Sequence, residues 1–134
     1  MKFVLVDYSV YYYSIVAKRP LPTLFRGKFV QLRKGRTEYL VLSPTELTPY
    51  HADIVEHFCR ERKIGGTYDK GKKRYDIDDP EWVISGGGKF EIDRERHTVR
   101  FYDDSMAYGK FDGRSLREQI GRSPAFKVFA IEIE

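Results

Sequence analysis

A chain of 134 residues with 41% hydrophobic and 15% aromatic residues can bury one real core and is too apolar to be disordered. Its single cysteine, Cys59, excludes an internal disulfide and a zinc site built from cysteines, and it suits a reducing cytoplasm. The net charge of +4 suits an anionic ligand, but basic and acidic residues are mixed along the chain, which does not favour nucleic acid. No uncharged run approaches about 18 residues, so we expect one cytoplasmic domain, 1–134, without a membrane span.

The first third of the chain predicts β structure. Aromatic and β-branched residues dominate 2–17, which favours strands, and a proline-containing connector follows at 18–22. Apolar residues then predict strands at 27–33 and 38–42. The turn KGRT between them makes the pair a hairpin, with Phe29 and Gln31 on the face opposite Val30 and Leu32.

The strongest helix prediction is 49–63. Thr48 is a good N-cap, Pro49 suits the first helical position, and the glycines of 64–66 end the helix. The following segment, 67–81, is charged and poor in core residues, so we expect a mobile or protruding loop there.

The second half predicts mainly strands and one more helix. A short strand, 82–85, leads into three glycines, and KFEID and HTVRFY form a second hairpin. A loop, a second helix capped by Asp112 or Ser115, and a final strand follow. Their ranges are 103–113, 114–121 and 125–133.

His51 lies in the first turn of the predicted helix. The helix N-terminus disfavours a positive charge, so it lowers the pKa of a histidine there and keeps the ring neutral. A neutral imidazole is a competent general base, and the unpaired N–H groups beside it attract phosphate. From position alone, an exposed or capping histidine is the commoner role.

Other chemistries have weaker signals. The glycines at 86–88 lack the spacing of nucleotide-binding loops and alone predict a bulge or a hairpin entry. The residue six positions after Cys59 is Gly65, where a cysteine-dependent phosphatase would have arginine. The three histidines do not have metal-ligand spacing. The basic run at 70–74 is followed at once by aspartates, so it predicts a solvated loop.

Three blocks, in this order, resemble the Janus/Ocnus family, the 14-kDa phosphohistidine phosphatases. They are YHADI at 50–54, GGGK at 86–89 and SMAYG at 105–109. The resemblance covers 25–133 and leaves 1–24 as an N-terminal β extension. It implies an α/β (α+β) fold in which a mixed sheet of about six strands packs between two helices. It also implies hydrolysis of the P–N bond of phosphohistidine without a metal or another cofactor.

The resemblance assigns a role to each block. His51 would be the general base that deprotonates the attacking water, with a covalent phosphohistidine at the same residue as the competing mechanism. Phosphate would be bound by side-chain charge, backbone N–H groups and the serine hydroxyl of SMAYG. The implied binding residues are Lys28, Tyr50, Gly86, Lys89, Ser105, Met106 and Ala107. The expected partner is a phosphohistidine-containing protein or a small phosphoramidate, with no nucleic acid, no membrane and the oligomeric state open.

The sequence also departs from the family pattern. The family has an Arg-Gly pair before YHADI, whereas Leu42-Ser43-Pro44 stands here. Residues 1–24 and 67–81 lie outside the pattern and could form a lid, a subunit contact or a specificity element. A non-catalytic phosphate- or phosphopeptide-binding module is therefore the alternative function, and a nucleic-acid binder using 70–74 ranks third.

Overall fold

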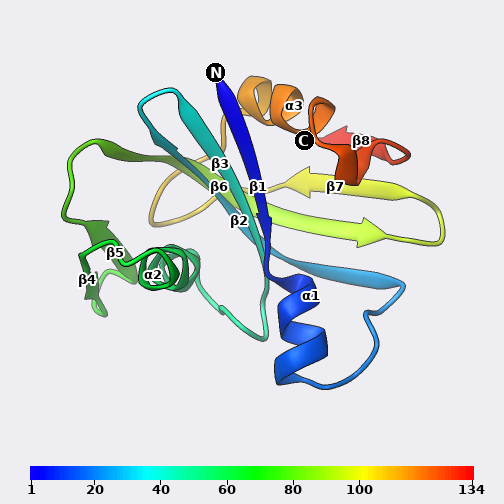
Figure 1. The fold of residues 1–134 in the computed structure, drawn as a ribbon, viewed down its shortest axis with the longest axis horizontal. Coiled ribbons are helices and arrows are strands. Elements are labelled where there is room, and N and C mark those ends of the chain that lie inside the picture. Colours follow the sequence, from blue (N-terminus) through cyan, green and yellow to red (C-terminus); the bar gives the residue numbers. More distant parts are fainter.

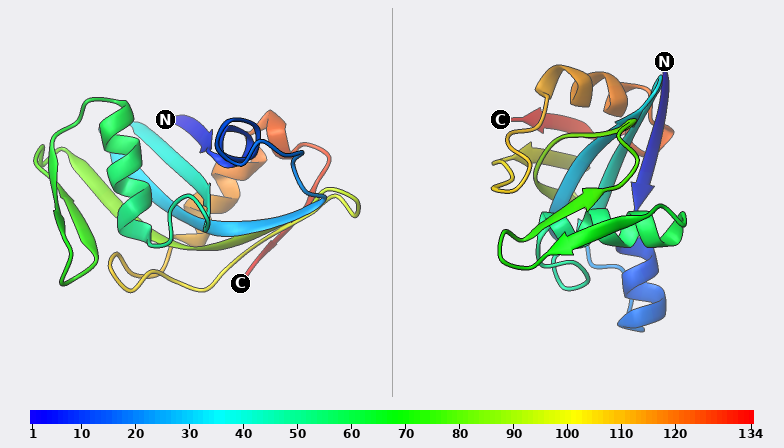
Figure 2. Two further views of the ribbon diagram at one scale, coloured as in Figure 1. Left: turned by 90° about the horizontal axis from the view of Figure 1, so that it is seen from below. Right: turned by 90° about the vertical axis from the view of Figure 1, so that its left-hand side faces the viewer.

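Six strands form one mixed sheet in the computed structural model, which describes residues 1–134 (Figure 1). In sheet order they are β1 (Lys2–Asp7), β3 (Thr37–Pro44), β2 (Leu24–Lys34), β6 (Trp82–Asp93), β7 (Thr98–Tyr102) and β8 (Ala130–Ile133). The inner pairs are antiparallel, whereas β1 on β3 and β8 on β7 are parallel. Figure 2 shows that the sheet is strongly curved.

Helices cover both faces of this sheet. They are α1 (Ser9–Tyr11) with its π-helical continuation η1 (Tyr12–Val16), α2 (His51–Glu61), α3 (Gly113–Gly121) and the 3-10 turn η2 (Pro124–Phe126). Neighbouring residues of β2 point to opposite faces, so Phe29 packs in the core with α3 and Val30 in the core with α2. The predicted α+β fold, with about six strands between two helices, is confirmed.

The N-terminal segment is only partly extended. β1 confirms the prediction of β structure for Lys2–Asp7, but the same prediction is wrong for residues 9–16, which are helical. The Asp7 carboxylate accepts a hydrogen bond from the Ser9 N–H at 2.9 Å and starts the helical turn. Tyr13 then packs into the core on the α3 side. This packing outweighs the strand preference of the aromatic run.

Helix α2 begins two residues later than predicted. Tyr50, not Thr48, is the N-cap, and the Asp53 carboxylate accepts a hydrogen bond from the Tyr50 N–H at 2.9 Å. Thr48 is buried instead, and its hydroxyl bonds to the Ser43 hydroxyl and to a backbone carbonyl. His51 is therefore the first helical residue.

Segment 67–81 contains a β-hairpin, whereas its charge predicts a mobile or protruding loop. It holds the hairpin of β4 (Gly66–Asp69) and β5 (Arg74–Ile77), which lies beside α2 in Figure 1. Tyr75 is 5% exposed and packs in the α2 core. One aromatic side chain thus anchors an otherwise polar segment.

The remaining predictions are mostly confirmed. β6 runs unbroken through the three glycines with a shift of register there, so the predicted bulge is present, but no hairpin entry is. Asp112 caps α3 by accepting hydrogen bonds from two backbone N–H groups of its first turn. The last strand is shorter than predicted because η2 occupies part of 125–133. None of the helices is long and apolar enough to cross a membrane.

Candidate active site

A cleft of about 520 Å³ opens where the start of α2 meets β2, β6, the loop after β7 and the turn of the β4–β5 hairpin. Six of the eight residues predicted from the sequence line it: Lys28, Tyr50, His51, Lys89, Met106 and Ala107. These residues come from four separate segments of the chain. The fold therefore brings most of the predicted site together.

His51 is held by a backbone group of the neighbouring strand. Its Nε2 lies 2.8 Å from the carbonyl oxygen of Gly88, and the ring is only 8% exposed. A carbonyl can only accept, so Nε2 carries the proton and Nδ1 carries the free lone pair. Nδ1 has no protein partner and is not among the fully enclosed polar atoms. The ring thus presents a basic nitrogen with solvent access.

The surroundings of His51 favour its neutral form. Burial lowers its pKa below the ordinary value of 6.5, and the nearby ammonium group of Lys28 lowers it further. The Gly88 carbonyl and the carboxylates of Asp103 and Asp104 act in the opposite direction and only partly offset this. The ring is therefore neutral at pH 7 and able to accept a proton.

The three glycines make room for this arrangement. A Cβ on Gly87 would lie 2.9 Å from Cδ2 of His51, and one on Gly86 would lie 2.4 Å from the backbone oxygen of Lys110. The N–H of Gly87 also donates to the carbonyl of Gly109 at 3.1 Å, which ties the loop after β7 to the sheet. Gly86, predicted as a binding residue, does not line the cleft; it packs against the backbone of Lys110.

The loop at 105–109 presents two free donors. The N–H groups of Met106 and Ala107 have no hydrogen-bond partner in the protein, and both residues line the cleft. Ser105 differs from its predicted role: it is 2% exposed, and its hydroxyl accepts a hydrogen bond from the Tyr108 N–H at 3.1 Å. Its side chain closes the loop instead of facing the cleft.

Two lysines on adjacent strands flank the cleft. Lys28 donates to the carbonyl of Pro49 at 2.7 Å, and its pKa is lowered by burial and by the charge of Lys89. Lys89 is paired with Asp103 at 3.0 Å, which raises the pKa of the lysine and lowers that of the aspartate. On the sheet side of the cleft, an anion would therefore meet one partly neutralised cation, Lys89, and one cation without a carboxylate partner, Lys28.

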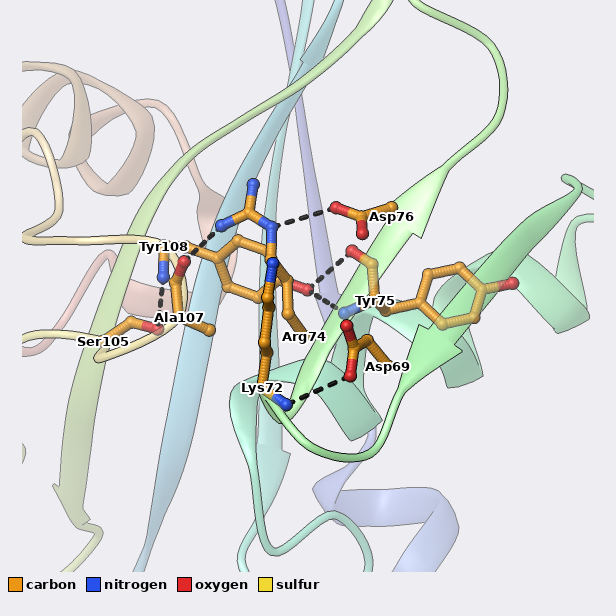
Figure 3. A network of polar contacts seen from close by, with 8 residues as sticks. All are labelled: Asp69, Lys72, Arg74, Tyr75, Asp76, Ser105, Ala107 and Tyr108. Atoms are coloured by element: carbon orange, nitrogen blue, oxygen red, sulfur yellow. Dashed lines mark hydrogen bonds and ion pairs between the residues drawn. The ribbon is translucent and has the colours of Figure 1, made fainter.

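The opposite wall comes from the β4–β5 hairpin. Lys72 and Lys73 line the cleft, as do Asp103 and Asp104, and none of these four was predicted as a site residue. The basic run at 70–74 is the sequence signal for Lys72 and Lys73, but the aspartates that follow it indicated a solvated loop. Contacts between the hairpin and the loop at 105–109, including one from Arg74, set this wall in place (Figure 3).

The site offers charge and hydrogen-bond donors, not metal ligands. The structure contains no group of three or more His, Cys, Asp or Glu side chains that could hold a metal ion. Around the neutral imidazole, the cleft presents the free N–H groups of Met106 and Ala107 and the ammonium groups of Lys28 and Lys89, with the carboxylates of Asp103 and Asp104 beside them. This combination can bind a phosphoryl group and accept a proton beside it.

The comparison with protein families gives one match. The model of the Janus/Ocnus family (Ocnus) matches residues 28–129, which is most of the chain and includes every residue of the cleft. No curated protein matches the chain.

Proposed function

The chain belongs to the Janus/Ocnus family, and from this premise we propose that it is a metal-independent phosphatase that hydrolyses the P–N bond of phosphohistidine in proteins. The observation that carries the proposal is the hydrogen bond from His51 to the Gly88 carbonyl. It leaves a neutral imidazole with its free nitrogen accessible, in a cleft rich in cations and free N–H groups. These are the parts that phosphoryl transfer to water needs.

In the proposed reaction, His51 acts as general base. Nδ1 takes a proton from a water molecule whose oxygen attacks phosphorus opposite the P–N bond. The P–O bond forms as the P–N bond breaks, and the electron pair of the broken bond stays on the departing imidazole nitrogen. A protonated leaving imidazole departs as a neutral molecule, so the protein mainly has to position water and stabilise charge.

The phosphoryl oxygens would be held by fixed donors and one cation. The unpaired N–H groups of Met106 and Ala107 supply hydrogen bonds, and Lys28 supplies positive charge from the adjacent strand. Lys89 contributes less because Asp103 already neutralises part of its charge. Preorganised donors of this kind stabilise developing negative charge without reorganising during the reaction.

The direct test is phosphate release in EDTA from free phosphohistidine and from a phosphohistidine peptide. We expect turnover by the wild type and a loss of about 10²–10⁴-fold for His51→Ala, the range that general-base catalysis contributes. His97→Asn is the matched control, because His97 lies in a distant turn at φ 54, a conformation that asparagine tolerates. Full activity of His51→Ala would rule the proposal out.

Two further outcomes separate the alternatives. Phosphate-dependent binding by a folded wild type that releases no phosphate would identify a non-catalytic binding module. Rapid quenching in alkali, which preserves phosphohistidine, followed by mass spectrometry of the peptide containing His51, distinguishes the two catalytic mechanisms. Phosphate on His51 would identify a covalent intermediate, and its absence during turnover supports direct attack by water.

A further inference from the structure

The hairpin turn places two lysines where the proposed reaction does not need them. The ammonium group of Lys73 donates to the Tyr50 hydroxyl at 3.0 Å and lies 4.2 Å from the centre of its ring. Lys28, on the sheet side, lies 5.5 Å from the same ring centre. Lys72 lines the cleft beside Lys73. Cations from both walls therefore converge around one exposed tyrosine.

Three of the four lysines of the cleft have no carboxylate partner. Lys89 pairs with Asp103, whereas Lys28, Lys72 and Lys73 form no ion pair within 4.0 Å. Like charges gathered in one cleft repel one another, and burial and the charge of Lys89 already lower the pKa of Lys28. Asp103 and Asp104 also line the cleft, but neither forms an ion pair with Lys72 or Lys73. The hairpin wall therefore carries two positive charges that a second anionic group of the ligand can meet.

The cleft is also larger than a phosphoryl group and has surfaces for a chain. Met106 is fully exposed at its rim, and the Tyr50 side chain remains 43% exposed despite its two lysine neighbours. An apolar thioether and an open aromatic ring suit contact with the backbone and side chains of a peptide. With phosphate beside His51, the second negative group would lie toward Lys72 and Lys73.

The hairpin is fixed relative to the phosphate-binding loop. The Tyr108 hydroxyl accepts from the Tyr75 N–H and donates to the Tyr75 carbonyl, both at 2.8 Å, and Arg74 donates to the Ala107 carbonyl (Figure 3). Lys73 has φ 50, which is unusual for a residue with a side chain and directs this turn. The two anion-binding walls are therefore held at a set spacing.

We propose that Lys72 and Lys73 form a second anion site that recognises an aspartate or glutamate flanking phosphohistidine in a protein substrate. This inference rests on the proposed function for the identity of the phosphorylated residue. It adds a substrate class: acidic phosphohistidine segments are preferred over neutral ones. It also gives the polar hairpin a role in specificity, separate from the chemistry at His51.

The test compares two phosphohistidine peptides that differ only in glutamate or glutamine on both sides of the phosphorylated residue. We expect the wild type to show a kcat/KM about three- to tenfold higher for the glutamate peptide, mainly through KM, and less so at high salt. The double variant Lys72→Gln/Lys73→Gln should lose this preference while keeping its rate on the glutamine peptide. Lys70→Gln, on the same turn but outside the cleft, should keep the preference.

Binding measurements separate failure of the inference from failure of the proposed function. The same peptides with a stable phosphonate analogue of phosphohistidine are titrated by fluorescence anisotropy. A glutamate preference that the double variant loses supports the second site even if no substrate is hydrolysed. Equal wild-type binding of both peptides overturns the inference, as does a preference that survives in the double variant. Tighter binding of a short single-stranded oligonucleotide than of the glutamate peptide would also overturn it, in favour of nucleic acid.

Discussion

The two walls of the cleft are built in different ways. On one wall, Lys28, Lys89 and the Gly88 carbonyl lie on adjacent strands of the six-stranded sheet, and His51 is bonded to that carbonyl. On the other wall, Lys72 and Lys73 lie on a two-stranded hairpin outside that sheet. The sheet wall cannot shift without disturbing the core, whereas the hairpin wall depends on the burial of Tyr75 and on a few hydrogen bonds to the loop at 105–109. We therefore expect substitutions in the sheet wall to impair the proposed chemistry and substitutions in the hairpin wall to change recognition.

The largest expected effect comes from disturbing the sheet wall with Gly87→Ala. The new Cβ would lie 2.6 Å from the backbone oxygen of Phe29 and 2.9 Å from His51. Overpacking of this kind costs about 1–3 kcal/mol, and a base displaced by about 1 Å loses about 10²-fold in rate. The midpoint of urea unfolding and the rate of phosphate release should therefore both be lower than in the wild type.

The matched control for that substitution is Gly121→Ala. No atom lies within 4 Å of a Cβ at Gly121, so stability and activity should be unchanged or slightly improved. If Gly87→Ala proves as stable and active as Gly121→Ala, the sheet wall can shift to accommodate the extra methyl group, and the expected rigidity is wrong.

A smaller effect is expected from loosening the hairpin wall with Tyr108→Phe. It leaves the Tyr75 N–H and carbonyl without their partner, at a cost of about 1–3 kcal/mol for the region. Burial raises the pKa of Tyr108 to about 12, so the wild-type hydroxyl keeps its proton at pH 7. Hydrogen exchange at the Tyr75 amide should accelerate, and the glutamate preference should weaken while free phosphohistidine is still hydrolysed.

Tyr39→Phe is the control for this second substitution. Its ring packs against Phe58 and Trp82, and its hydroxyl makes no hydrogen bond within the protein, so exchange at Tyr75 should not change. If Tyr108→Phe lost the hydrolysis of free phosphohistidine as well as the glutamate preference, the two walls would not be independent.

The smallest effect concerns pH and Lys28 of the sheet wall. The proposed reaction needs neutral His51, so phosphate release should fall as the pH drops through the pKa of His51, which lies below 6.5. Lys28→Gln removes a charge that lowers this pKa, so the acid limb of the activity profile should move to higher pH. NMR titration of the His51 ring checks this without activity, with Lys127→Gln as control. A shift to lower pH would contradict it.

The sequence predicted the sheet wall well because its signals are local. Alternation in 27–33 places Phe29 and Val30 on opposite faces of the sheet. His51 was predicted as a site residue from the resemblance of YHADI, GGGK and SMAYG to the Janus/Ocnus family, and it lies in the cleft. The helix start was missed by two residues because the Thr48 hydroxyl hydrogen-bonds to the buried Ser43 hydroxyl and does not cap the helix.

The hairpin wall was missed because its stability is not local. One buried tyrosine, Tyr75, and the hydroxyl of Tyr108, 33 residues away, hold a segment whose composition is that of a loop. Alternation and charge carry no information about such distant partners. The helical turn at 9–16 was missed for the same reason, because it is stabilised by the packing of Tyr13 against core residues distant in the sequence.

The hydrogen bond between His51 and the Gly88 carbonyl has a consequence for how this protein tolerates mutation. The partner that fixes the imidazole is a main-chain atom, so no amino-acid substitution at position 88 deletes it outright. Position 88 is constrained by size alone, because a Cβ there would lie 2.6 Å from the Tyr102 carbonyl oxygen. The orientation of the histidine is thus encoded by the path of a strand and not by the identity of a second side chain. A single substitution can remove the imidazole, but none can remove the carbonyl group that orients it; misalignment requires a shift of the strand or a steric contact with the ring, such as a Cβ at position 87 would make.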